Sequence, residues 1–377
     1  MTAHGMSWEL FRALARGGGG AEAVRLLSSA RRSRTLMMIS LVARRAAPDV
    51  VAAYQALKEV SAAAPETADL VLAHPMTGVV VSRACRAPGT VRPDLFAGLA
   101  LAVGLRAGLD LTVEAPCEEL FLPGVGHVRG GTEYSVSGGL LRVEGVPHRP
   151  RRPTRLALGP LRLELDTDVD VPRWQDVMAA GWDELVRHHP EVAQECAAAI
   201  TVLSPMPTPP SGMASATLAD AFGCVHLSLP PDARTAALTL THELQHAKLA
   251  VLLDLFELTA AHPGELFYAP WRDDPRPLVG LLHGTYAHLG VASFWRRYDD
   301  EHAQVEHAHW RTASRRAATT MLESGRLTEL GTTFVTEIAG VLEGWDDRVS
   351  PAARAAAEAA LTRHRALWEG AHHVHPG

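Results

Sequence analysis

The residues of this chain best suited to chemistry lie in the segment Thr241-His242-Glu243-Leu244-Gln245-His246. In an α-helix, residues four apart lie on the same face, so His242 and His246 would direct two imidazoles toward one point. Glu243 would stand about 100° further around the helix, beside an ion that the two rings hold. The segment therefore predicts a metal centre with a carboxylate that contacts a bound water or the substrate.

This His-Glu-x-x-His pattern also has a plain explanation. In a chain with 19 histidines it arises by chance in about one shuffled sequence in twenty, and a surface helix could carry it without function. Here, however, Leu238, Leu249 and Leu253 surround it on an apolar helix, where unpartnered imidazoles and a carboxylate would be costly to bury. We therefore expect a metal site.

A third protein ligand is expected further along the chain. No glycine and histidine follow at metzincin spacing, and Glu265, near the distance of a gluzincin glutamate, stands in an expected loop. His283 and His288 lie in the next apolar stretch, five residues apart, which places them about 140° apart around a helix. Because they cannot easily face one ion together, His288, deeper in that stretch, is the preferred third ligand, with His283 as the alternative.

Two arginines precede these histidines, in the segment Tyr268-Ala-Pro-Trp-Arg-Asp-Asp-Pro-Arg. An arginine near a metal can hold a carboxylate through two parallel charge-assisted hydrogen bonds. Arg272 and Arg276 are therefore candidates for binding an acidic cofactor or substrate. Equally, they could anchor Asp273 or Asp274 at the surface, and the sequence leaves both interpretations open.

Three further features have simpler interpretations. His302, His307 and His309 lie in a polar stretch and are expected on a solvated helix face, while His372, His373 and His375 belong to a disordered tail. The glycine-rich segment from Gly124 to Gly130 superficially resembles a phosphate loop. It opens no helix and lacks the Gly-Lys-Ser/Thr ending, so it is expected to form turns.

Helices must position most of these residues. One is expected from Ser7, a capping residue, to the glycines at 17–20, and another opens at His74-Pro75. Further helices are expected over residues 21–41, 48–64, 95–109, 174–188, 191–203, 233–258, 277–297, 327–345 and 351–368. Asp232 can cap the helix that carries His242. Alternating apolar residues predict strands over 111–115, 134–137, 140–144 and 161–165, and a short strand is expected over 223–229.

These elements predict a mostly α fold with a smaller β portion, an α+β class. The strand at 223–229 followed by the metal-binding helix is similar to the zincin order, here within a helical catalytic domain. Three regions are expected. They are an N-terminal helical region over 1–110, a β-rich hairpin region over 111–171, and a helical metal-binding catalytic domain over 172–377.

The composition is that of an ordinary globular protein, with 47% apolar and 21% charged residues and a net charge of −6. The one dense basic stretch, His148 to Arg155, is broken by prolines and has no aromatic neighbours. That favours a solvated loop or a contact for an acidic peptide over a nucleic-acid groove. No secretory signal or membrane-length apolar run is seen, and four widely spaced cysteines suggest reduced thiols, so a cytoplasmic protein is expected.

Several motifs in order resemble a known family. They are the segments 215–228, Thr241 to Leu249, 269–278 and 286–291, and the likeness spans most of the chain, most strongly from about 200 to 300. They are similar to the HExxH-motif proteins of ribosomal-peptide (RiPP) natural product clusters, also called 2-oxoglutarate-dependent HExxH-type peptide β-hydroxylases. In some members the domain is fused behind a radical SAM enzyme.

The resemblance implies an Fe(II) centre that uses dioxygen and 2-oxoglutarate to hydroxylate the β-carbon of a residue in a precursor peptide. It implies that Arg276 or Arg272 holds the far carboxylate of 2-oxoglutarate, and that Glu243 orients a ligand or binds the substrate. The chain has no CxxxCxxC motif, so it looks like a stand-alone member whose partners are the precursor peptide and a co-encoded radical SAM maturase.

Two other functions stay open at this point. One is a zinc metallopeptidase that trims a leader or precursor peptide, with Glu243 as the general base. The other is a non-catalytic peptide-binding partner in a maturation complex. Two imidazoles suit zinc and iron alike, so the ligand types alone do not identify the metal.

Overall fold

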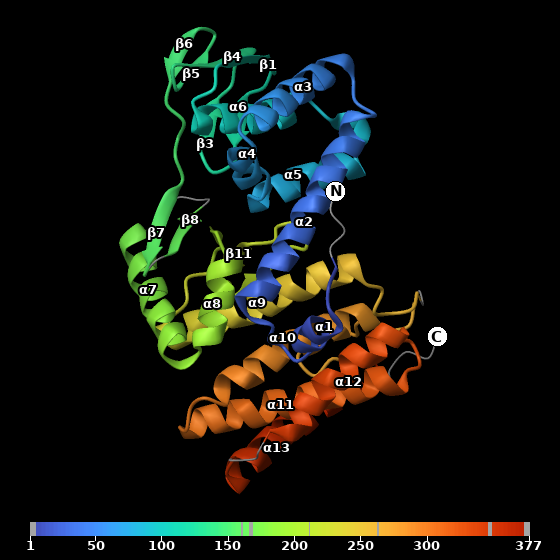
Figure 1. Cartoon of the computed structure of the whole chain (residues 1–377). Helices are drawn as coiled ribbons and strands as arrows, with labels where there is room; N and C mark the ends of the chain where they lie inside the picture. Colours follow the sequence, from blue (N-terminus) through green and yellow to red (C-terminus); the bar gives the residue numbers. More distant parts are fainter. Residues whose placement is uncertain are drawn as a thin grey trace. The chain divides into compact units, whose positions relative to one another are not determined.

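The computed structural model of the chain describes residues 5–159, 161–165, 169–210, 212–261, 264–345 and 349–372. Helices dominate and strands make up a smaller portion, which confirms the mostly α, α+β class (Figure 1). The chain forms two compact units. The first contains residues 28–176 and 200–229, and the second contains residues 2–27, 177–199 and 230–377.

One apolar helix, α6 (Asp94–Ala107), is central to the first unit and packs against α3 (Pro48–Ala63) and α4 (Pro65–Leu72). Gly108 ends α6 in the left-handed conformation, near the expected place. Most of α2 (Gly20–Ala43), α5 (Pro75–Arg86) and the short 3-10 helix η1 (Pro88–Thr90) complete this part. Their buried side chains form one core with strand residues such as Tyr134.

Three sheets accompany these helices. An antiparallel sheet has the order β1 (Leu111–Glu114), β4 (Glu133–Ser137), β5 (Leu140–Val143) and β6 (Val146–His148). A hairpin pairs β2 (Glu119–Leu122) with β3 (Gly126–Arg129). The third has the order β10 (Ser215–Ala216), β11 (Cys224–Leu227), β9 (Val202–Pro205), β8 (Leu161–Leu165) and β7 (Thr154–Leu158), with β9 parallel to both its neighbours.

The second unit is helical. Figure 1 shows α10 (Leu278–Trp295) packed between α9 (Ala233–Leu255) and α11 (Glu301–Glu323). Because α10 is covered on both sides, almost all of its residues are buried, as expected for a helix that is apolar all round. The remaining helices are α1 (Trp8–Ala15), the later part of α7 (Val171–His188), α8 (Pro190–Ala199), α12 (Glu329–Gly344) and α13 (Pro351–His372).

Helix starts agree well with the sequence. The Ser7 side chain accepts a hydrogen bond from the backbone N–H of Leu10, and Asp232 accepts one from Thr235, so both expected caps are confirmed. The helix expected over 191–203 instead ends at Ala199, because Val202 to Pro205 join the five-stranded sheet as β9. Strands β2, β3, β6, β7, β9 and β10 were not expected.

The compact units follow a different division from the three consecutive regions expected. Most of the helices before residue 110 and the strands after it share the first unit, whereas residues 2–27 belong to the second unit. Strand β11 belongs to the first unit and α9 to the second. Among the described residues, no helix is long and apolar enough to cross a membrane.

Candidate metal site

Helix α9 brings the two histidines of the motif together. The Nε2 atoms of His242 and His246 lie 3.1 Å apart, and their ring centroids are separated by 4.7 Å. Two nitrogen ligands at about 2.1 Å from one ion lie roughly 3.0–3.4 Å apart for the usual coordination angles. The pair therefore has the spacing of two ligands of one ion, and equally that of a direct hydrogen bond between two neutral rings.

Glu243 lies next to this pair. Its side chain is 1% exposed, and one carboxylate oxygen lies 4.0 Å from Nε2 of His242. The carboxylate therefore sits beside the point at which an ion between the rings would be held. This placement agrees with the expected position and suits contact with a ligand of that ion.

His288 is held against the pair from α10. Its ring centroid lies 5.3 Å from that of His242, and the ring stacks between the indoles of Trp271 at 4.6 Å and Trp310 at 4.3 Å. Nδ1 of His288 lies 2.8 Å from the carbonyl oxygen of Gly284, which leads us to assign the proton to Nδ1. The Nε2 atom is then left with a lone pair, the form that binds a metal.

Gly284 makes this stacking possible. A methyl group on Gly284 would lie 2.4 Å from the indole of Trp271, far inside ordinary contact distance. Gly284 is buried within α10, so the indole of Trp271 would have to shift to make room for the methyl group. The lack of a side chain at Gly284 therefore lets Trp271 stack on the imidazole of His288. The carbonyl oxygen of Gly284 also accepts the Nδ1–H of that imidazole.

His283 flanks the pair from the other end. Its ring centroid lies 5.9 Å from that of His246, whereas His288 is the neighbour of His242. The four imidazoles thus follow one another in the order His288, His242, His246, His283. This arrangement agrees with the expectation that His283 and His288 point to different places, and only His288 has its ring orientation set by stacking on both faces.

The imidazoles of the site are held neutral. Burial lowers the pKa of His242 to about 4, and burial together with the neighbouring His242 lowers the pKa of His246 to about 3. Burial, reinforced by His242, also holds the pKa of His288 well below its ordinary value. Neutral imidazole is the form that donates a lone pair to a metal, so the environment favours the ligand form at neutral pH.

Both arginines of the preceding segment bind Asp274. The Nε of Arg272 donates to one carboxylate oxygen at 2.7 Å, and Nη1 of Arg276 donates to the other at 3.3 Å. Arg276 is also the cation that acts on His283, whose pKa is lowered by burial and then by Arg276. Its backbone N–H and carbonyl pair with those of Phe267. Arg276 is therefore fastened near the imidazoles, while its guanidinium shares one carboxylate with Arg272.

Among the described residues, no group of three or more His, Cys, Asp and Glu side chains is placed so that it could hold a metal ion. The features that favour an ion are the spacing of two imidazoles and the orientation of a third. Two neutral imidazoles present Nε2 atoms at ligand spacing, and a third ring with its Nδ1–H engaged stacks beside them. The donor set fits a divalent metal that prefers imidazole nitrogen.

A second layer of contacts fixes α9. Lys248 is completely buried, and its Nζ lies 2.8 Å from a carboxylate oxygen of Glu195 and 2.8 Å from the carbonyl of Gly17. Nε2 of Gln245 donates to the same carbonyl at 2.9 Å. Nothing in the local pattern predicted this buried ion pair, because its partners come from 53 and 231 residues away.

The three histidines His302, His307 and His309 of α11 differ in their exposure to solvent. His307 is buried at 4% exposure and its Nδ1 lies 2.8 Å from the carbonyl of Ala292, so its placement on a solvated face was wrong. His309 is half-buried and His302 is exposed. Helix α11 packs on α10, α12 and α13. The sequence pattern that indicates this buried face is the helical spacing of small or apolar residues, namely Ala303, Ser314, Ala317 and Met321.

Other expected features are placed as follows. Glu265 lies outside any helix and its carboxylate lies 2.9 Å from Nε of Arg326, so it does not take the helical position of a gluzincin ligand. His372 ends α13, while His373 and His375 lie outside the described residues. No protein-family model matches the chain, and no curated protein matches it either.

Proposed function

We propose that this chain is a non-haem Fe(II)- and 2-oxoglutarate-dependent oxygenase that hydroxylates the β-carbon of a residue in a ribosomally made precursor peptide. One observation carries the proposal. Two neutral imidazoles of α9 present Nε2 atoms 3.1 Å apart beside a third, oriented imidazole. A standard gluzincin peptidase is disfavoured, because Glu265 lies in a loop and pairs with Arg326. The family resemblance of the motifs supplies the oxygenase chemistry.

His242, His246 and His288 are the proposed metal ligands, with His283 as the alternative third ligand. Such a set leaves positions for a bidentate 2-oxo acid and dioxygen, as in non-haem iron oxygenases. When bound, Fe(II) supplies the redox chemistry by which one oxygen atom enters the peptide C–H bond and the other enters succinate, with loss of carbon dioxide.

The chain's own residues would bind and orient the reactants. Arg276 is the better candidate for the far carboxylate of 2-oxoglutarate, because its charge acts on His283 next to His246. Arg272, whose side chain is 51% exposed against 35% for Arg276, would assist through their shared partner Asp274. A guanidinium can hold a carboxylate bidentately, so cofactor binding would compete with Asp274.

The aromatic stack would keep water from one side of the centre. Trp271 and Trp310 cover both faces of His288 and hold the imidazole in one orientation. Glu243, buried beside His242, would position a ligand or the substrate. An oriented and desolvated set of ligands of this kind costs little reorganisation when the cofactors bind.

The test uses protein reconstituted with Fe(II) under anaerobic conditions. With 2-oxoglutarate, oxygen and the precursor peptide encoded beside it, we expect a one-oxygen mass gain and an equal amount of succinate. His242→Ala and His246→Ala should each abolish iron binding and turnover, while His302→Ala, an exposed histidine of the same unit, should not. Complete absence of a mass gain from iron-loaded protein would contradict the proposal.

A zinc metallopeptidase is the second candidate, favoured by the carboxylate of Glu243 next to His242. In that case Glu243 is the general base and the product is a cleaved peptide. Glu243→Gln should then abolish cleavage while leaving zinc bound, whereas an oxygenase would show no cleavage with either residue.

A third candidate is a non-catalytic peptide-binding partner, which would keep its binding in His242→Ala and His246→Ala.

The proposed partners are the precursor peptide and a co-encoded radical SAM maturase. All four cysteines are free, which accords with the proposed cytoplasmic location. The zincin-like relation of β11 to α9 is likewise proposed from their order in the chain.

A further inference from the structure

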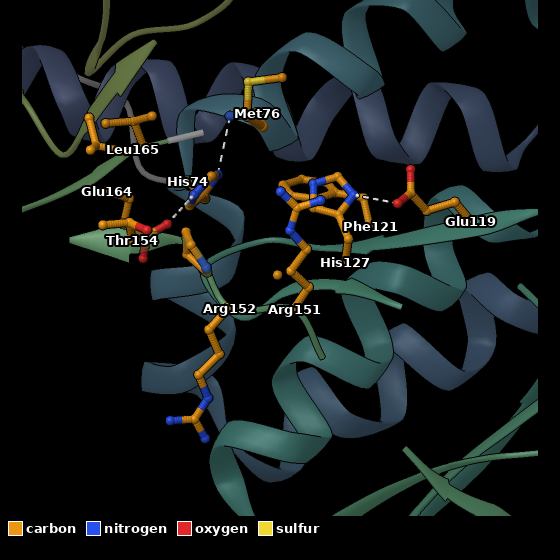
Figure 2. Close-up of a pocket in the computed structure, with 14 residues that line it drawn as sticks. His74, Met76, Glu119, Phe121, His127, Arg151, Arg152, Thr154, Glu164 and Leu165 are labelled. Carbon is orange, nitrogen blue, oxygen red and sulfur yellow. Dashed lines mark hydrogen bonds and ion pairs between the residues drawn. The ribbon is translucent and has the colours of Figure 1, made fainter. Parts of the chain in front are cut away.

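Two sequence features without a role at the metal site meet in the first unit. The glycine-rich turn and the basic stretch both line a cavity of about 260 Å³, shown in Figure 2. Gly124, Gly126 and His127 line it from the hairpin, and Arg151 to Thr154 line it from the basic stretch. Every lining residue belongs to the first unit.

Backbone hydrogen bonds join the glycine-rich turn to the basic stretch. His127 donates its N–H to the carbonyl of Arg151 at 3.1 Å, and Arg151 donates back at 2.7 Å. Gly126 has a φ of +129°, and a methyl group there would lie 2.0 Å from the carbonyl oxygen of Arg151. The glycine therefore lets the basic stretch lie directly against β3.

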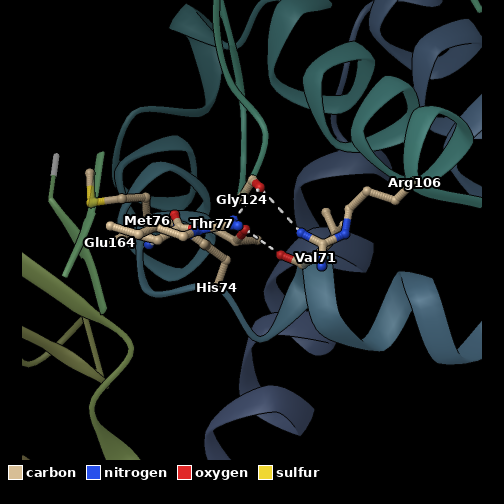
Figure 3. Close-up of polar contacts among 8 residues, drawn as sticks. Val71, His74, Met76, Thr77, Arg106, Gly124 and Glu164 are labelled. Carbon is tan, nitrogen blue, oxygen red and sulfur yellow. Dashed lines mark hydrogen bonds and ion pairs between the residues drawn. The ribbon is translucent and has the colours of Figure 1, made fainter. Parts of the chain in front are cut away.

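The turn itself is held by arginines. Arg106 donates to the carbonyl of Gly124 at 3.2 Å, as Figure 3 shows, and Arg155 donates to the same carbonyl at 3.4 Å. In these hydrogen bonds the turn presents the carbonyl oxygen of Gly124, and not a row of backbone N–H groups, to the guanidiniums of Arg106 and Arg155. The turn is consequently a wall of the cavity and does not have the form of a phosphate-binding loop.

The carboxylates of the cavity already have partners. Glu164 on β8 lies 2.7 Å from Nη2 of Arg155 and 3.3 Å from Nε2 of His74. Burial alone would raise the pKa of Glu164, but hydrogen bonds from His74 and Arg155 lower it below its ordinary value. At the rim, Glu119 is 67% exposed and lies 3.6 Å from Nδ1 of His127.

Positive charge extends from the cavity to its outside. In Figure 2 the Arg151 side chain rises beside the rings of Phe121 and His127, whereas the Arg152 side chain extends away from them. Among the described residues, Arg152 forms no ion pair. Because the two side chains extend in different directions, the pair suits an extended anionic chain better than a small anion.

We propose that this cavity and the adjoining basic stretch bind an acidic segment of a peptide. One carboxylate would lie against Arg151, a flanking carboxylate against Arg152, and an apolar side chain against the partly buried Phe121. The cavity has only one phenylalanine among its lining residues, so it lacks the successive stacking platforms of a single-stranded nucleic-acid groove. That the peptide is the substrate of the metal site rests on the proposed function; the binding itself does not.

The experiment measures the fluorescence anisotropy of a short labelled peptide of alternating glutamate and leucine with the full chain. We expect saturable binding that weakens as salt rises and is weakened about tenfold or more by Arg151→Gln with Arg152→Gln. The matched control is Arg44→Gln with Arg45→Gln, two exposed cations of the same unit, which should bind like the original chain.

The inference is overturned if the double variant binds as well as the original chain, or if a peptide of alternating glutamine and leucine binds equally. It is also overturned if only inorganic phosphate or a single-stranded oligonucleotide competes and free glutamate peptide does not.

His242→Ala should bind the acidic peptide normally. If it does while no hydroxylation is found in the original chain, the proposed function fails and this inference stands. Turnover without peptide binding at the cavity would overturn this inference and leave the proposed function standing.

Discussion

At the scale of single residues, the orientation of His288 depends on its neighbours more than on its own place in α10. Trp271 and Trp310 cover its two faces, and the carbonyl of Gly284 takes the proton of Nδ1. Outer contacts of this kind orient metal-binding imidazoles and set their tautomer. The tryptophans should therefore matter for metal binding although neither has a ligand atom.

Gly284→Ala tests this dependence. The added methyl group would collide with the indole of Trp271, so we expect a loss of about 1–3 kcal/mol in the free energy of unfolding and weaker metal binding. Gly340→Ala, in α12 of the same unit, is the matched control because a methyl group there meets nothing within 4 Å. It should stabilise the protein by about 0.5–1 kcal/mol through helix propensity. Urea unfolding and metal titration of both variants would check this, and equal effects would contradict it.

His189 predicts a pH dependence of stability. It is 5% exposed, stacks on Phe294, and its Nε2 lies 3.0 Å from the hydroxyl of Tyr298. Burial lowers its pKa from 6.5 to about 4, so the unfolded chain binds a proton at a higher pH than the folded chain does. Its contribution to stability is complete above pH 6.5 and is lost as the pH falls toward 4.

At pH 5 this one residue should cost about 2 kcal/mol relative to neutral pH. The measurement compares urea midpoints at pH 7.5 and pH 5 for the original chain and His189→Gln. The variant should be less stable at neutral pH but lose less on acidification, and the exposed-residue variant His302→Gln should behave like the original. An unchanged pH dependence in His189→Gln would refute the assignment.

At the scale of elements, α9 is held in place by side chains on a different face from the one that carries His242 and His246. Lys248 and Gln245 donate to the carbonyl of Gly17, which follows the C-cap of α1, and Lys248 also pairs with Glu195 on α8. These contacts fasten three helices at the level of the metal motif. The position of His242 and His246 should therefore be sensitive to a residue that points away from them.

Lys248→Met leaves the carboxylate of Glu195 buried without its cation, which we expect to cost roughly 3–5 kcal/mol. The double variant Lys248→Met with Glu195→Leu should recover much of that loss, because no uncompensated charge is left. Glu358→Gln removes the exposed ion pair with Arg316 and should cost less than about 1 kcal/mol. Denaturant unfolding measures all three, and a loss from Glu358→Gln as large as that from Lys248→Met would count against this interpretation.

At the scale of the whole molecule, metal binding should be linked to folding. An ion that binds the folded chain but not the unfolded one raises the free energy of unfolding by about 2.7 kcal/mol at a hundred times its dissociation constant. We expect Fe(II) or Zn²⁺ to raise the thermal midpoint of the original chain and a chelator to reverse this. His242→Ala should respond to neither metal. If the metals shifted both proteins equally, the site would lie elsewhere.

The local features of this protein can be predicted from the residue pattern alone. The spacing of His242 and His246 in an apolar helix predicted their approach, and Ser7 and Asp232 predicted helix starts, because caps and helix faces depend on residues within one or two turns. The position of His288 in a buried helix also followed from its apolar neighbours. Local geometry was enough in each case.

Contacts between residues far apart in the chain become visible only in the folded structure. It placed His288 and His283 at opposite ends of the histidine pair, buried His307, and brought Trp310 from a stretch expected to face solvent onto His288. It also paired Lys248 with Glu195 and joined a glycine turn to a basic stretch at one cavity. Such contacts depend on the packing of elements far apart in the chain, and residue spacing carries no record of that packing.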